Sequence, residues 1–131
     1  MKFPIYDISE SSWNNARIKQ HNILHENPYL ALFIASRNRE KFTKQIREFK
    51  FVDPDGILYK VTDYKILPNK GLKKLFFIFK KIEFEFVRVD EKYTIEMFKE
   101  LLLNRAKEEQ NGKLEEIVKS ANSFKDILSK I

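Results

Sequence analysis

The chain contains no cysteine, and only three of its 131 residues are glycine. Without cysteine there is no disulfide, no thiolate metal site and no thiol nucleophile, which fits a reducing compartment. The glycines, at positions 56, 71 and 112, are too far apart to form a loop that cradles phosphate groups. Two histidines and no Gly-x-Ser-x-Gly motif leave little acid–base or nucleophilic chemistry. We therefore expect a protein that is not an enzyme and that holds no cofactor.

Long apolar runs are also missing. No stretch approaches the ~18 apolar residues of a membrane-spanning helix, and the N-terminal residues lack the apolar core of a signal peptide. Hydrophobic residues make up 43% of the chain and charged residues 34%, which is the balance of a soluble globular protein. We expect one domain over residues 1–131, in the cytoplasm.

Metal ligands are few and poorly spaced. His21 and His25 are four residues apart and would share one helix face, but Asn22 stands where a zinc protease helix needs glutamate. No third ligand can be identified, so we expect no metal site. The aspartates of the middle region are Asp53, Asp55 and Asp63. We interpret them as turn residues, because a tight turn favours Asp-Pro-Asp-Gly.

Positive charge is concentrated in one short part of the chain. The net charge is +6, and residues 65–81 alone contain six lysines and no acidic residue. A second basic run, over residues 37–50, is opposed only by Glu40 and Glu48. Such local fields attract anionic partners. We predict a partner-binding surface made of Arg37, Arg39, Lys41, Lys44, Arg47, Lys70, Lys73, Lys74, Phe76, Phe77, Lys80 and Lys81.

Residues 70–81 place five large apolar residues between pairs of lysines, and three structures remain open for them. A helix would lie on a membrane surface. An extended segment would stack the bases of a single-stranded nucleic acid. A buried strand with solvated lysines at both ends needs no ligand. In a strand, either Phe76 or Phe77 turns away from its neighbour, and it becomes an exposed anchor if its face is uncovered.

Residues 49–61 predict a β-hairpin. Phe49 and Phe51 alternate with a lysine before the turn sequence Asp-Pro-Asp-Gly, in which Gly56 is expected to have a positive φ. We expect Phe51 and Tyr59 to be mostly buried. Alternation over residues 82–86 predicts a third strand, which begins as early as residue 75 and is interrupted at residues 80–81 by a bulge or turn.

The remaining patterns are mostly helical. Ser11 or Ser12 can cap a helix from Trp13 to about Glu26, which Asn27-Pro28 would end. A further helix is expected near residues 38–47, whereas residues 29–35 fit either a strand or a helix. These elements and the C-terminal third predict an α+β fold, with an antiparallel sheet of three to four strands, an N-terminal helix and a C-terminal helical hairpin.

In the C-terminal third, Thr94 is expected to cap a helix whose apolar stripe is Ile95, Phe98, Leu102 and Ala106. Gly112 follows where a left-handed residue would close that helix. Apolar residues at spacings of three and four predict one second helix from Lys113 to Ile131. The two helices would form a hairpin that covers one face of the sheet.

The segment Phe51-Val-Asp-Pro-Asp-Gly-Ile-Leu-Tyr-Lys-Val resembles the Asp-x-x-Gly-x-x-Tyr-x-Val hairpin of small bacterial α+β proteins, some of which are immunity proteins that neutralise toxins. The resemblance covers roughly residues 40–103. It implies a non-catalytic protein that blocks a toxin by protein–protein contact. Blockers of nucleases usually present acidic surfaces, whereas this chain is basic, so its toxin should be acidic. The alternative is a nucleic-acid-binding domain, and a peripheral membrane protein comes third.

Overall fold

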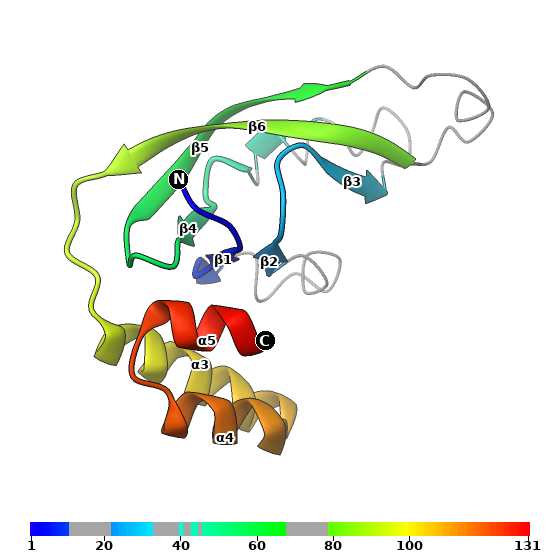
Figure 1. Cartoon of the computed structure of the whole chain (residues 1–131). Coiled ribbons are helices and arrows are strands. Elements are labelled where there is room, and N and C mark those ends of the chain that lie inside the picture. The colour runs from blue at the N-terminus through cyan, green and yellow to red at the C-terminus, as the bar shows by residue number, and fades with distance from the viewer. Residues whose placement is uncertain (11–21, 33–39, 41–42, 45, 68–78) are drawn as a thin grey trace.

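The computed structural model describes residues 1–10, 22–32, 40, 43–44, 46–67 and 79–131, and over these it has an α+β fold (Figure 1). The strands are β1 (Ile5–Asp7), β2 (Ile23–Leu24), β3 (Tyr29–Leu32), β4 (Lys50–Val52), β5 (Leu58–Ile66) and β6 (Phe79–Val89). The helices are α3 (Ile95–Glu109), α4 (Gly112–Ser120) and α5 (Phe124–Lys130).

The described strands form one antiparallel sheet of six in the order β2-β1-β4-β5-β6-β3. β2 and β3 stand at opposite edges, yet only residues 25–28 separate them along the chain. In a flat sheet these edges would be about 24 Å apart, whereas five extended residue steps span at most about 18 Å. The sheet must therefore curl, and Figure 1 shows β5 and β6 arching over the other strands.

The predicted β-hairpin is confirmed. β4 and β5 pair with Phe51 opposite Tyr59, and Gly56 in the connecting turn has a φ of +80°. The buried carboxylate of Asp53 fixes the turn, because its Oδ1 accepts hydrogen bonds from the backbone N–H groups of Asp55 and Ile57, both at 2.9 Å. Phe51 is buried as expected, whereas Tyr59 is only half-buried.

The third predicted strand is also present, as β6. It runs without interruption from Phe79 through Lys80 and Lys81, so the bulge or turn expected there is wrong. The irregularity lies instead in β5, between Val61 and Asp63. Pairing with β3 explains the continuous strand, because four residues of β3 pair with residues 79–82 and hold this part of β6 extended.

The predicted sheet of three to four strands is too small, since the described sheet has six. The strands that were not predicted are short, because β1, β2 and β3 have only three, two and four residues. Runs this short show no periodicity of their own. β2 lies within the helix predicted from Trp13 to Glu26, so that helix is wrong in its last part, and residues 11–21 lie outside the described residues. Residues 29–32 prove to be strand. Of the helix expected over residues 38–47, the described residues 40, 43, 44 and 46 are helical.

The C-terminal region differs from a two-helix hairpin. Thr94 caps α3 as predicted and accepts a hydrogen bond from the N–H of Met97 at 3.3 Å. The left-handed residue that ends α3 is Gln110 (φ 54°), whereas Gly112 is the first residue of α4. The predicted long second helix is divided, since α4 ends at Ser120 and Ser123 caps the separate helix α5.

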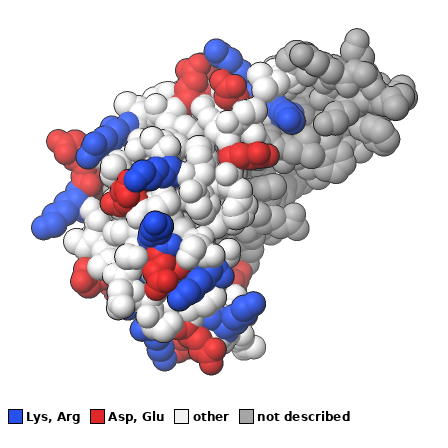
Figure 2. Space-filling model, in the orientation of Figure 1, with Lys and Arg blue, Asp and Glu red and all other residues white. Residues whose placement is uncertain are grey.

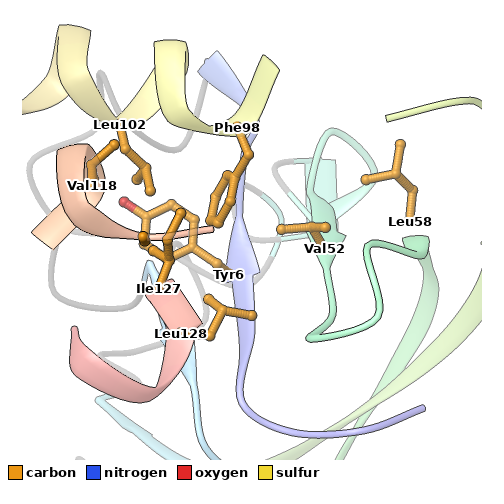
Figure 3. Packing of buried hydrophobic residues seen from close by; sticks show 9 residues of the cluster. Tyr6, Val52, Leu58, Phe98, Leu102, Val118, Ile127 and Leu128 are labelled. Atoms are coloured by element: carbon orange, nitrogen blue, oxygen red, sulfur yellow. The ribbon is translucent and has the colours of Figure 1, made fainter. Parts of the chain in front are cut away.

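The described core consists of two clusters on opposite faces of the curled sheet. The first joins residues of non-adjacent strands, so that Phe51 of β4 contacts Phe84 and Phe86 of β6 with ring centroids 6.5 and 5.9 Å apart. We call the face that carries it the inner face. The second cluster lies between the outer face and the helices (Figure 3). There the ring of Phe98 packs edge-on against Tyr6 and stacks on Phe124.

Candidate functional site

Charge is strongly segregated along this chain. The two basic runs, residues 37–50 and 65–81, contain twelve of the 25 basic residues and two of the 19 acidic ones, Glu40 and Glu48. The rest of the chain has 13 basic and 17 acidic residues and a net charge of −4. On the face shown in Figure 2, the described lysines and arginines are interspersed with aspartates and glutamates. The two runs, which we call the basic segments, therefore carry the entire positive excess.

Described residues of both basic segments lie at the same end of the β5–β6 hairpin. The chain leaves β5 for residues 68–78 at Leu67, whose N–H donates to the carbonyl oxygen of Lys81 at 2.9 Å. Thr43, directly after residues 41–42, shares a 2.9 Å hydrogen bond with the hydroxyl of Tyr64 in β5. Ile46 belongs to the same buried cluster as Ile82 of β6. We call this end of the hairpin the distal end, because α3–α5 lie at the other end (Figure 1).

The structure describes four of the predicted partner-binding residues. Lys44, Arg47 and Lys81 are exposed, and Lys80 lies in β6 opposite Ala31 of β3. The distal end thus holds Lys44 next to Thr43 and Lys81 next to Leu67. The other predicted residues lie outside the described residues, and they are Arg37, Arg39, Lys41, Lys70, Lys73, Lys74, Phe76 and Phe77.

Two further lysines of the basic runs are paired with glutamates. Lys65 lies 3.5 Å from Glu85 on the neighbouring strand. Lys50 donates to Glu91 at 2.7 Å, and the hydrogen bond and charge of Lys50 lower the pKa of Glu91. Lys50 stands opposite Lys60 in the sheet, so Glu91 also offsets a repulsion between like charges. These pairs reduce the charge that Lys50 and Lys65 offer to a partner.

The aspartates around the hairpin do not converge on a site. Asp53 is buried in the turn that it fixes, Asp55 is paired with Lys2 at 3.3 Å, and Asp63 accepts a hydrogen bond from the N–H of Tyr64. Among the described residues, no three histidine, aspartate or glutamate side chains are grouped so that they could hold a metal ion. His25 is exposed, and His21 lies outside the described residues.

The sequence reasoning missed a buried cation, Arg105 of α3. Its Nη1 donates to the carbonyl oxygen of Asp7 at 2.8 Å and its Nη2 to that of Ser9 at 3.2 Å. The guanidinium also lies 5.5 Å from the centre of the Tyr6 ring. These contacts attach α3 to the chain at the end of β1. One feature of the sequence could have revealed this buried arginine. Arg105 is a charged residue within the apolar stripe of α3, where it falls between Leu102 and Ala106 on the buried face.

Two tyrosines near Arg105 have perturbed acidity. Burial raises the pKa of Tyr93 to about 12, and it raises the pKa of Tyr6 despite the opposing charge of Arg105. The buried Tyr93 hydroxyl has no hydrogen-bond partner in the described part of the chain. Both phenols therefore stay protonated near neutral pH, which makes them unsuited to act as general bases. We interpret the arrangement as the structural attachment of α3.

No helix among the described residues is long and apolar enough to cross a membrane. Comparison with protein-family models, with curated protein sequences and with solved structures finds no match for this chain. The charge distribution and the geometry of the distal end are therefore the basis on which a function can be inferred.

Proposed function

We propose that this is a non-catalytic binding protein that neutralises an acidic protein partner through its basic segments. The partner class follows from the resemblance of the hairpin to bacterial immunity proteins, so we infer that the partner is a cognate toxin. The observation that carries the proposal is the segregation of charge, with twelve basic and two acidic residues in the basic segments. The lack of cysteine suits a reducing compartment, and we place the protein in the cytoplasm.

The described residues next to positions 68–78 support this proposal. Leu67 and Phe79 flank these positions at the distal end, where Lys44 and Lys81 are exposed. Opposite charge on two surfaces accelerates their encounter and excludes wrong partners, whereas affinity comes mainly from a few buried aromatic and arginine side chains. Phe76, Phe77, Arg37 and Arg39 are among the residues of those types in the basic segments.

The experiment uses the full chain and the product of the gene directly upstream, which we expect to encode the toxin. Isothermal titration and gel filtration should show a tight complex of fixed stoichiometry. Reversing three charges in Lys70→Glu, Lys73→Glu and Lys74→Glu should slow association sharply and weaken the complex. The matched control is Lys107→Glu, Lys113→Glu and Lys125→Glu, which changes the net charge equally on exposed sites of α3–α5 and should leave binding almost unchanged.

A labelled single-stranded oligonucleotide distinguishes the nucleic-acid alternative. The same lysines would release counterions from its phosphates, so its affinity would fall steeply between low and moderate salt. Binding of this kind, lost in the Lys70, Lys73 and Lys74 variant and kept in the control, would replace the toxin proposal by a nucleic-acid function. A toxin complex that is insensitive to both triple variants would show that the basic segments do not form the interface.

A further inference from the structure

Strand β6 has an edge that is only partly paired. β3 pairs with residues 79–82, and the next position is closed by the side chain of Asn27, which makes two hydrogen bonds with the backbone of Phe84. The Asn27 Nδ2 donates to the Phe84 carbonyl oxygen, and its Oδ1 accepts from the Phe84 N–H, both at 2.9 Å. No strand of the described chain continues this edge beyond Phe84, although β6 extends to Val89.

The direction of the backbone groups follows from these bonds. Successive residues of a strand direct their N–H and C=O groups to alternate sides. The Phe84 groups face Asn27, so those of Phe86 and Arg88 face the same side, away from β5. The carbonyl oxygens of Lys81 and Glu85 confirm the alternation, because they accept hydrogen bonds from Leu67 and Thr62 on the β5 side. β6 keeps this phase because the register irregularity lies in β5.

The backbone N–H and C=O groups of Phe86 and Arg88 have no hydrogen-bond partner among the described residues. We call this stretch the open edge. Free groups of this kind are a template for an added strand. Asn27 limits the template on one side, so an added strand would pair only with the stretch from Phe86 towards Val89.

The side chains along the open edge define the chemistry of an added strand. Arg88 is exposed and has no ion-pair partner among the described residues, whereas Glu85 is engaged by Lys65. Val87 lies on the outer face of the sheet and is 48% exposed. Residues directly opposite each other on paired strands point to the same face. An added strand therefore gains most from an acidic residue opposite Arg88 and an apolar residue opposite Val87.

We propose that the open edge binds an extended segment of another protein in which acidic and apolar residues alternate. The segment adds to the sheet antiparallel to β6, with its acidic side chains on the face of Arg88 and its apolar side chains on the face of Val87. This surface is separate from the basic segments and does not depend on their proposed function.

The first test uses the free protein. Amide hydrogen exchange measured by NMR should be fast at Phe86 and Arg88 and slow at Glu85 and Val87, whose N–H groups face β5. Equal protection at all four positions would overturn the proposal, because the edge would then be covered. Protection of Phe86 and Arg88 that increases with protein concentration would assign the edge to a second copy of the chain and would also overturn it.

The second test adds the synthetic peptide acetyl-Ser-Glu-Val-Glu-Val-Glu-Ser-amide. NMR titration should show shift changes centred on residues 86–88 and slowed exchange at Phe86 and Arg88. A residue opposite Arg88 directs its own N–H to the edge, so N-methylation of the glutamate amides should abolish binding, and N-methylation of the valine amides should preserve it. A peptide with lysine in place of glutamate is the charge control and should bind about tenfold more weakly or not at all.

Variants at Arg88 separate the charge from the hydrogen bond. Arg88→Ala keeps the outward N–H and should weaken peptide binding, whereas Arg88→Pro also removes that donor and should abolish it. Arg88→Glu should reverse the preference towards the lysine peptide. Slow exchange at Glu85 and Val87 shows that each variant keeps its fold.

The variant with glutamate at Lys70, Lys73 and Lys74 should bind the peptide as the unchanged protein does. A failure of the open-edge proposal can therefore be told apart from a failure of the proposed function. Equal binding of the glutamate and lysine peptides, or no change at residues 86–88, would overturn the proposal.

Discussion

The two ends of the β5–β6 hairpin differ in what covers their outer face. At the end near the helices, Leu58 pairs with Val89, and Leu58 is 2% exposed within the cluster under α3–α5. At the distal end, Lys65 pairs with Glu83 on the same face, and Lys65 is exposed. One continuous strand pair is thus part of a core at one end and a charged surface at the other.

Charge follows the same division. Among the described ion pairs of the helices, Lys119 pairs with Glu115 and Lys130 with Asp126, each within a single helix. On the sheet, Lys50 and Lys65 reach glutamates that are distant in sequence, and the unbalanced charge lies in the basic segments. We therefore expect the helix-covered end to contribute most to stability, and we propose the distal end and the open edge as the binding surfaces.

The largest effect is expected in the core under the helices. Phe98 is fully buried, and its ring contacts Tyr6 and Phe124, so Phe98→Ala should cost about 3–5 kcal/mol. Val87→Ala on the uncovered face should change the free energy of unfolding by about 0.5 kcal/mol or less. Urea unfolding measures both. If Val87→Ala lowered the free energy of unfolding nearly as much as Phe98→Ala, the outer face at Val87 would have to be covered. The difference between the core under the helices and the uncovered face would then not exist.

The next effect concerns the contact between the hairpin turn and α5. Gly56 has a φ of +80°, and a Cβ there would lie 2.7 Å from Cε2 of Phe124, so Gly56→Ala should cost about 2–4 kcal/mol. Gly112→Ala is the matched control, because a Cβ there has open space and α4 gains up to about 1 kcal/mol. In a Phe124→Ala background, Gly56→Ala should destabilise the protein less, because the clash with the Phe124 ring is absent. The destabilisation caused by the positive φ of residue 56 should remain. An equal cost in both backgrounds would contradict the close contact with α5.

Local patterns in the sequence predicted the elements that depend on local interactions. The turn that contains Gly56, the alternation of Ile82 and Phe84, and the Thr94 cap each involve neighbours within a few residues. The break before α5 was also detectable, because Ser123 and Asp126 have the spacing of a helix-capping motif. The apolar spacing that continues across the break outweighed that signal.

The elements that the sequence did not reveal depend on contacts between distant residues. β1, β2 and β3 are held in place by partner strands, and the apolar residues of β2 also fit a helical period. In the candidate site, composition identified the basic residues, but nothing in it showed that Lys50 would be paired with Glu91. The open edge was equally hidden, because it follows from the position of Asn27, which lies 57 residues from Phe84 in sequence.

The smallest expected effect is that of the ion pair between Lys50 and Glu91. Glu91→Gln removes a charge that offsets the facing Lys50 and Lys60, but the pair is exposed, so the melting temperature should fall by about 2 °C or less at low salt. Lys50 lowers the pKa of Glu91, so the pair stabilises the protein above the ordinary pKa of the carboxyl group and loses its effect as the pH falls through the lowered value. Thermal unfolding of both proteins from pH 7 down to pH 3 should show the difference shrinking at acidic pH, and high salt at pH 7 should reduce it as well. A difference that persists at pH 3 would mean that Glu91 acts through packing and not through its charge.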